Sequence, residues 1–256
     1  MSTAQAAVYK GSQPRVLLNL GWLAFGVAVA AAGFVTATGP GFRLGLWGYN
    51  ACYKMMIFAA YTGLVAAAFA AGLVPFVLLR ERYKAVISIV LAIVVGLTAA
   101  AVPWKMSQTM HAAQGITDVS TDTVTPPPFI AVLKLHSTAS RDSAAYPGEA
   151  VANVQRQAFP DIQPVRVSLP PIEAFALAHG VAVGLGWRVV SANGVDGVIE
   201  AYDPSPWYGL TDDIVIRVRP EGSGARIDIR SRARNDGQDF GKNGARVRAF
   251  LRALRG

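Results

Sequence analysis

The sequence predicts an α+β protein in which three N-terminal transmembrane helices precede an antiparallel four-stranded sheet domain packed with helices. Two observations lead to this fold class. The first hundred residues contain three apolar stretches without a charged residue, and residues 187–234 contain four short segments of strand composition with a helical pattern before and after them. The order helix, four strands, helix is typical of a sheet with helices covering one of its faces.

The apolar stretches cover residues 17–38, 55–79 and 85–102. Each is close to the ~20 residues that cross a bilayer as a helix. A cleaved signal peptide is the alternative for the first stretch, but that stretch exceeds the usual apolar length of a signal, and two further spans follow it. We therefore expect an N-terminal segment at 1–16, a membrane anchor at 17–104, an extended linker at 105–129 and a folded domain at 130–256.

Basic residues flank the three spans unevenly. Those on one side are Lys10, Arg15, Arg80, Arg82 and Lys84, and those near the other side are Arg43, Lys54 and Lys105. Because the more basic side usually faces the cytoplasm, we expect a cytoplasmic N-terminus. Three spans then place the C-terminal domain outside, which in a bacterial inner membrane is the periplasm, and make the lipid bilayer the first partner.

Each span also carries small residues four positions apart. They are Ala24, Ala28 and Ala32 in the first span, Ala59, Gly63, Ala67 and Ala71 in the second, and Ala92, Gly96 and Ala100 in the third. Such stripes let helix backbones approach closely in lipid. Two interpretations stay open: the stripes reflect a high alanine content, or they pack the helices against each other or against another membrane protein.

Charge and cysteine content exclude several classes of function. Residues 1–104 have a net charge of +6, while residues 105–256 have 17 basic and 15 acidic residues, a net charge of +2. This domain is not basic enough to predict nucleic-acid binding. Cys52 is the only cysteine, so an internal disulfide and a cysteine-rich zinc site are excluded, and we expect no cofactor.

The linker and the folded domain are predicted from turn signals and periodicity. Three prolines at 126–128 favour an extended path that docks on the domain. A short helix is expected at 149–158, and a second opens at Pro170-Pro171 and ends near Gly186, with Ile172, Phe175, His179 and Val183 on its apolar face. Strands are expected at 187–192, 198–202, 213–219 and 226–234, joined mainly by glycine-containing hairpin turns.

A final helix is expected from its cap at Asp239 to about Arg255. Its apolar positions, which are predicted to pack on the sheet, are Phe240, Val247, Phe250, Leu251 and Leu254.

The last strand carries an unusual concentration of charge. Strict alternation along the strand puts five charged side chains on one face, namely Arg226, Asp228, Arg230, Arg232 and Arg234. By the same alternation Arg217 and Arg219 lie on this face of the neighbouring strand, and we expect Arg246 to reach it from the final helix. Unpaired arginines would repel each other, so either carboxylates or a bound anion must neutralise them.

Four segments of this region resemble the domain-of-unknown-function family 1499. They are Thr121-Asp122-Thr123 with the following prolines, residues 212–218, residues 228–234 and residues 239–246. The resemblance covers roughly residues 116–254. It implies a common fold unit and recurring polar positions, and it implies no chemistry.

These considerations give a set of candidate ligand-binding residues: Arg217, Arg230, Arg232, Arg234, Arg246, Asp122, Asp212, Asp213, Asp239 and Asn243. Two hypotheses apply to them, an internal salt-bridge network or a site for an anionic small molecule or lipid headgroup. We expect Arg234 and Arg246 to belong to the network and Arg230 to the ligand.

No catalytic or metal-binding residue is predicted. Motifs for a serine nucleophile, a zinc helix and a phosphate loop are missing from the sequence, and its histidines are widely separated. Asp212 and Asp213 are adjacent, so in a strand they point to opposite faces. The sequence favours a non-enzymatic accessory or binding module of a membrane complex. An envelope enzyme of hydrolase type that uses Asp and Arg side chains, and a purely structural anchor, remain as alternatives.

The predicted orientation can be measured with a reporter that is active only in the periplasm. Fused after Gly256 it should be active, and fused after Glu81 it should be silent, because the basic residues of the short loops favour the cytoplasm. The reverse pattern would contradict the orientation and move the C-terminal domain to the cytoplasm.

Overall fold

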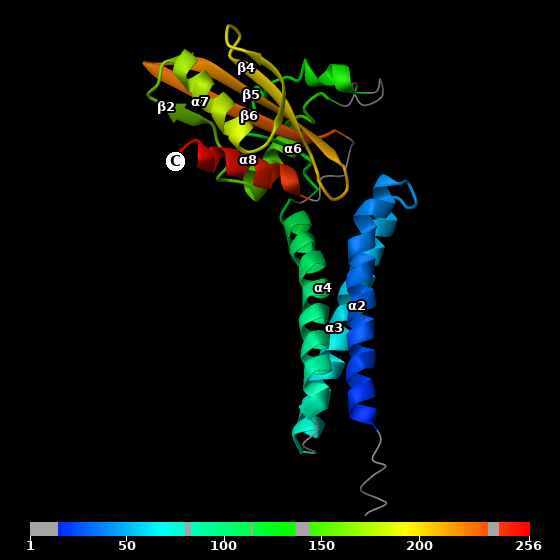
Figure 1. The fold of residues 1–256 in the computed structure, drawn as a ribbon. Helices are drawn as coiled ribbons and strands as arrows, with labels where there is room; N and C mark the ends of the chain where they lie inside the picture. The colour runs from blue at the N-terminus through cyan, green and yellow to red at the C-terminus, as the bar shows by residue number, and fades with distance from the viewer. Residues whose placement is uncertain (1–14, 80–82, 114, 137–143, 235–240) are drawn as a thin grey trace, which may run out of the picture. The chain divides into compact units, whose positions relative to one another are not determined.

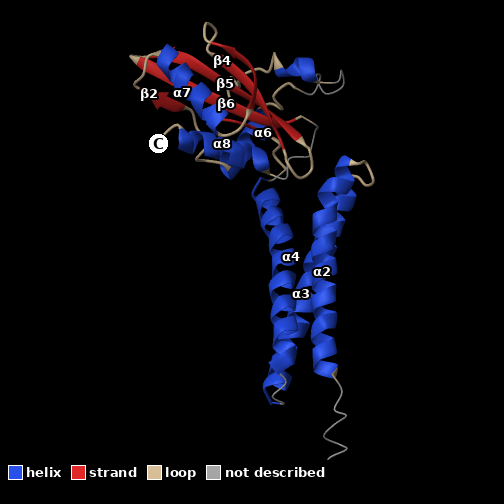
Figure 2. Cartoon of the chain, viewed as in Figure 1, coloured by secondary structure: helices blue, strands red, loops and turns tan. Residues whose placement is uncertain are grey.

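The structure, a computed structural model, describes residues 15–79, 83–113, 115–136, 144–234 and 241–256 (Figure 1). The chain divides into two compact units, one ending at Met106 and one beginning at Ser107. The first unit contains membrane helices, and the second contains a mixed sheet and helix domain (Figure 2). Each unit has its own packing and is described by itself.

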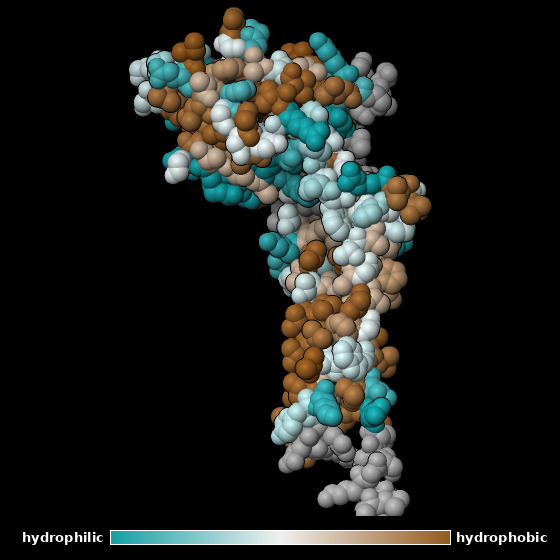
Figure 3. Space-filling view, viewed as in Figure 1, coloured by the Kyte–Doolittle hydropathy of each residue, from teal (hydrophilic) through white to brown (hydrophobic). Residues whose placement is uncertain are grey.

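The membrane unit consists of long apolar helices: α2 (Val16–Arg43), α3 (Tyr49–Leu79) and α4 (Val86–Ala113), with the short 3-10 helix η1 (Tyr83–Ala85) before α4. All three long helices have the length and composition to cross a membrane, which confirms the three predicted spans. Figure 3 shows apolar side chains over much of the visible surface of these helices, interspersed with residues of intermediate hydropathy.

Small residues pack the three membrane helices against one another. Most members of the predicted stripes are buried inside the bundle, including Ala28, Ala59 and Ala92, whereas Ala71 is exposed. Helices α3 and α4 approach each other closely, and a Cβ added to Gly63 would lie 2.6 Å from the carbonyl oxygen of Gly96. Since no side chain fits there, the glycines allow the two backbones to touch.

The described residues of the second unit that follow α4 form six strands and four helical segments. The strands are β1 (Asp118–Ser120), β2 (Val165–Val167), β3 (Arg188–Asn193), β4 (Val198–Pro204), β5 (Thr211–Glu221) and β6 (Gly224–Ala233). The helical segments are η2 (Val132–Leu135), α6 (Glu149–Ala158), α7 (Pro171–Gly184) and α8 (Lys242–Ala253).

The sheet is antiparallel and is organised around β6. Strands β3 to β6 form the predicted meander, which confirms the four expected strands. Two short strands extend the sheet, because β1 and β2 both pair with the far side of β6, with Ser120 opposite Arg230 and Val165 opposite Ile227. The segment expected as an extended linker therefore contributes strand β1.

One face of the sheet is covered by α7 and α8, and the main core lies beneath them. Val247, Phe250 and Leu251 of α8 are buried there as predicted, with Phe250 stacked on Trp187 at a centroid distance of 5.6 Å. Leu254 is also buried. The helix begins at Lys242 after Gly241, whose φ of 74° is left-handed, while the predicted cap Asp239 and the core position Phe240 lie outside the described residues.

The predicted core face of α7 is wrong in part, since Phe175 packs against the core as expected but its two aliphatic members do not. Ile172 and Val183 are exposed, and the helix instead buries Ala174, Ala178 and Ala182 against the sheet. The alanine stripe has the same four-residue spacing as the larger side chains. Its small volume lets the helix lie close to the strands, which a hydrophobicity pattern alone does not reveal.

A fragment beginning at Met106 should fold cooperatively without the membrane helices, because the core under α7 and α8 is built from residues of the second unit alone. Its urea unfolding, followed by circular dichroism and by tryptophan fluorescence, should give coincident single transitions. A fragment without cooperative unfolding would show that the domain depends on its membrane half.

Candidate functional site

The charged side chains of β6 lie on the sheet face that α7 and α8 do not cover. We call this the arginine face, formed by the side chains of Arg217 and Arg219 on β5 and of Arg226, Asp228, Arg230 and Arg232 on β6. The intervening residues Ile227 and Ile229 enter the core on the opposite face, as the alternation predicts. Residues 121–136 run over the arginine face, where Phe129 and Val132 form a second apolar cluster with Val215.

Arg230 is buried and bonded on every nitrogen of its guanidinium. Its Nε and Nη2 donate to the two carboxylate oxygens of Asp118 at 2.9 and 2.6 Å. Nη1 donates to the carbonyl oxygen of Pro127 at 3.2 Å, and Nη2 donates also to that of Ala144 at 3.0 Å. The bidentate pair locks β1 to β6, and it leaves Arg230 in the network rather than at a ligand, in contrast to the expectation from the sequence.

Two aromatic rings complete the enclosure of Arg230. Its guanidinium carbon lies 4.7 Å from the ring centroid of Phe129 and 5.3 Å from that of Tyr146. Cation-π contacts of this kind are strongest where water is excluded. Burial, together with the negative charge of Asp118, raises the pKa of Tyr146 to about 12, so its hydroxyl stays protonated.

A second buried group surrounds Asp213. One carboxylate oxygen accepts hydrogen bonds from Nε and Nη2 of Arg234 at 3.2 and 2.8 Å, and the other lies 2.7 Å from Nε2 of His136. The side chains of Asp213 and His136 are fully buried. Arg234 also lies over the ring of Tyr202 at 5.3 Å, and the neighbouring Arg232 is buried. Arg234 therefore belongs to the network, as expected.

Glu200 is a further buried carboxylate on this side of the sheet. Its oxygens accept the backbone N–H groups of Ile130, Ala131 and Val132 at 2.8 to 3.0 Å. These donors precede and open η2, so the carboxylate caps that short helix. Together with the contact of His136 to Asp213, this cap fixes both ends of residues 130–136 to the sheet.

Arg246 lies on the other face of the sheet, so the expectation that it reaches the arginine face is wrong. It projects from α8, which covers the opposite face. Its Nη2 donates to Asp203 at 2.8 Å and to Asp212 at 2.7 Å, and its Nη1 donates to Asn243 at 2.7 Å. Asn243 in turn accepts from Ser231 at 2.6 Å. Asp212, Asn243 and Arg246 thus connect α8 to the sheet, separately from the arginine face.

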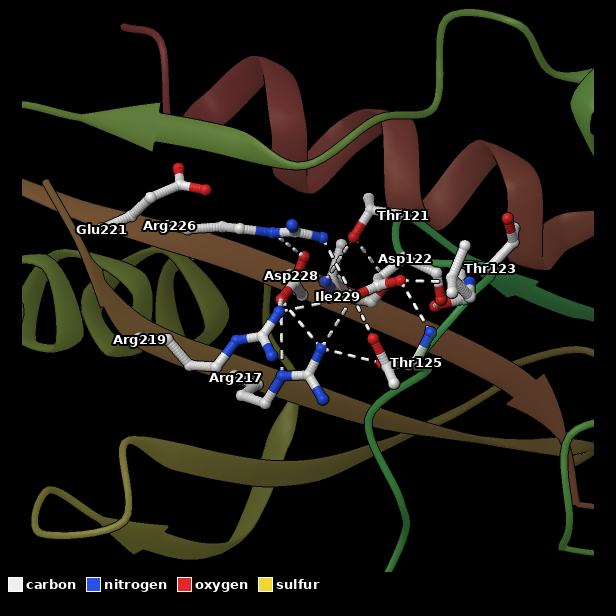
Figure 4. A network of polar contacts seen from close by, with 12 residues as sticks. Thr121, Asp122, Thr123, Thr125, Arg217, Arg219, Glu221, Arg226, Asp228 and Ile229 are labelled. Carbon is white, nitrogen blue, oxygen red and sulfur yellow. Dashed lines mark hydrogen bonds and ion pairs between the residues drawn. The ribbon is translucent and has the colours of Figure 1, made fainter.

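The remaining part of the arginine face is an open cluster of three arginines and two carboxylates (Figure 4). Nη2 of Arg217, Arg219 and Arg226 all donate to Asp122, at 3.1, 3.3 and 2.9 Å. The same arginines also contact Asp228, with distances between 2.9 and 3.3 Å. We call these five residues the open cluster.

Asp122 is held in place by its own loop. Its Oδ1 accepts the backbone N–H groups of Val124 and Thr125 at 3.1 and 2.9 Å, and its Oδ2 accepts the Thr125 hydroxyl at 3.2 Å. Burial by itself would raise the pKa of this carboxyl, but these hydrogen bonds and the charge of Arg226 outweigh burial and lower the pKa below its usual value. Asp122 is therefore ionised wherever the domain is folded near neutral pH.

Thr121 joins the loop to β6. The backbone N–H of Ile229 donates to the Thr121 hydroxyl at 2.9 Å, and the backbone N–H of Thr121 donates to the carbonyl oxygen of Ile229 at 2.9 Å. The Thr-Asp-Thr motif thus has a physical role. Its first residue fixes the position of the loop along β6, and the carboxylate of its second offsets part of the positive charge of the three arginines.

The open cluster keeps unused hydrogen-bond donors. Among the described residues, Nη1 of Arg217, Arg219 and Arg226 has no bonding partner, and the side chain of Arg219 is 40% exposed. Three guanidinium groups face two carboxylates, which leaves one positive charge in excess. Arginine donors in a fixed planar fork are well suited to a carboxylate, phosphate or sulfate oxygen.

The structure thus separates the candidate residues into four groups: the open cluster with Arg217 and Asp122, the buried pair of Arg230, the group of Asp213 with Arg234 beside the buried Arg232, and the opposite-face group of Asp212, Asn243 and Arg246. Asp239 lies outside the described residues.

The sequence does not predict Asp118 as a site residue, because the role of this residue depends on pairing with Arg230, 112 positions later in the chain. In the described part of the chain, no group of three metal-ligating side chains occurs.

Three membrane helices and an α+β domain with a charged, partly covered sheet face define a membrane protein with an additional folded domain. The chain belongs to the DUF1499 family, whose model, described as a protein of unknown function, matches residues 118–254. The match begins at the first residue of β1 and ends just after α8. No curated protein and no solved structure matches the chain significantly.

Replacing a buried arginine of the network should destabilise the domain strongly, because the carboxylate left behind is buried without its partner. We expect Arg230→Ala and Arg246→Ala each to lower the free energy of unfolding of the Met106 fragment by about 3 kcal/mol or more. Urea unfolding of the variants measures this directly.

Arg166→Ala is the matched control, because Arg166 forms an ion pair with Glu221 in which the two side chains are 69% and 37% exposed. Its cost should stay within about 1 kcal/mol. Equal losses for the buried and the exposed arginines would contradict the assignment of Arg230 and Arg246 to a buried network.

Proposed function

We propose that the protein is a membrane-anchored, non-enzymatic binding module whose sheet domain holds an anionic group at the open cluster. The observation that carries this proposal is the combination of one excess positive charge with an unused Nη1 on each of Arg217, Arg219 and Arg226 among the described residues. The shared chemistry of the ligand is an oxyanion, carried by a small molecule or by a lipid headgroup.

The two carboxylates support binding rather than oppose it. Asp122 and Asp228 hold the three guanidinium groups in one place, so that a ligand does not have to order three flexible side chains. The same carboxylates keep the affinity for a small anion moderate, since they offset two of the three charges. A ligand with several oxyanion oxygens gains most, because it can accept from more than one guanidinium at once.

The remaining parts of the proposed function concern place and partners. The excess of basic residues on one side of the spans supports a periplasmic position for the domain in a bacterial inner membrane. Association with another membrane protein belongs to the proposal as well. For that contact the bundle offers its lipid-facing surface, because most of the small-residue stripes already pack the three helices of this chain.

Anion binding can be measured on the full-length protein in a neutral detergent. Phosphate and pyrophosphate, compared with chloride at equal ionic strength, should raise the melting temperature, because a ligand of the folded state stabilises it. We expect Arg219→Gln to weaken binding about tenfold, equivalent to about 1.4 kcal/mol, which is typical of one hydrogen bond to a charged group.

Arg252→Gln is the matched control, because it removes the same charge at an exposed position of α8, away from the arginine face. It should leave phosphate binding unchanged. Adding micelles of an anionic phospholipid to the same samples tells a headgroup ligand from a soluble one. The proposal fails if no oxyanion stabilises the protein, or if the two variants weaken binding equally.

A further inference from the structure

The membrane unit contains a groove that packing of its helices does not fill. It lies between α2 and α3, has a volume of about 500 Å³, and is lined by Val27 of α2 and by α3 side chains from Lys54 to Val65. Phe58, which lines the groove, meets Phe34 of α2 edge to face with a centroid distance of 5.9 Å. The volume is in the range of sites that bind small molecules.

The length of the groove matches one leaflet of a bilayer. Lys54 and Val65 are eleven residues apart on α3, which corresponds to about 16 Å along a helix that rises ~1.5 Å per residue. Half of a ~30 Å hydrocarbon core is about 15 Å. The groove therefore extends from the level of the headgroups to about the middle of the membrane, as an acyl chain does.

The polar end of the groove carries a positive charge. Among the described residues that line the groove, Lys54 is the only charged one; it is exposed and lies in the second turn of α3. A lysine near the end of a membrane helix extends its ammonium toward the headgroups. The positive N-terminal end of the α3 dipole adds to this potential. No ion pair of Lys54 with another described residue competes for a phosphate.

The geometry points to a binding site for one anionic phospholipid, with its phosphate at Lys54 and one acyl chain in the groove between α2 and α3. Ordinary lipid surrounds every membrane helix without selection. This site differs because an open apolar groove and a cation at its polar end recognise two parts of the same molecule. It lies in the leaflet at the α2–α3 connection and is separate from the open cluster of the sheet domain.

The test is native mass spectrometry of the full-length protein released from mixed micelles that contain equal amounts of phosphatidylglycerol and phosphatidylcholine. We expect one retained phosphatidylglycerol, preferred over phosphatidylcholine about tenfold. Lys54→Gln should reduce this preference to near parity, while Lys54→Arg should keep it. Lys84→Gln, which removes a basic residue of η1 outside the groove, should have no effect.

A second pair of variants tests the apolar part of the site. Val65→Trp should fill the groove and abolish retention, whereas Val94→Trp, at a similarly exposed position of α4, should not (67% and 56% exposed). Arg219→Gln should leave retention unchanged, which separates this site from the one on the sheet domain. Equal retention of both lipids by the unaltered protein, equal effects of Lys54→Gln and Lys84→Gln, or a second protein copy in place of the lipid would overturn the proposal.

Discussion

The pairing of Asp118 with Arg230 is the contact on which the architecture of the sheet domain depends. Strand β1 has only three residues, so its backbone hydrogen bonds with β6 could not hold it in register by themselves. The bidentate ion pair, enclosed by Phe129 and Tyr146, adds a strong contact that holds β1 in register on β6. Once β1 is fixed, the following loop carries Asp122 over the arginines of β5 and β6, and η2 can dock through Glu200. Removing Arg230 alone would leave the carboxylate of Asp118 buried without its partner.

The arginines of the domain differ in how completely their donors are used. Arg230 and Arg246 are buried and bonded on all their nitrogens, so they can stabilise the fold but cannot exchange a protein oxygen for a ligand without loss. In the described part of the chain, Nη1 of Arg217, of Arg219 and of Arg226 has no hydrogen-bond partner, although all three side chains contact Asp122 and Asp228. Structural and binding roles are therefore divided between different residues of one charged surface.

The sequence predicts those features that local periodicity determines. Charge-free stretches predict the membrane helices, and alternation predicts both the arginine face and the opposite directions of Asp212 and Asp213. It does not predict contacts that tertiary packing decides. The face from which Arg246 approaches depends on where α8 docks, and the burial of Ala174 rather than Ile172 depends on how closely α7 approaches the sheet. Three-residue strands such as β1 and β2 are too short to show any period.

The position of β1 in the chain has a mechanical consequence. This strand begins shortly after α4 ends at Ala113, so β1 is the first strand of the sheet that tension along the chain from the membrane helices reaches. To detach the strand, the tension must break the Asp118–Arg230 pair, the strand ladder and the bonds between Thr121 and Ile229 within four residues of chain. Ala113 and Ile116, which precede β1, are already buried in the core beneath α7 and α8. The domain is thus reinforced at its point of attachment by core packing and by this dense set of bonds.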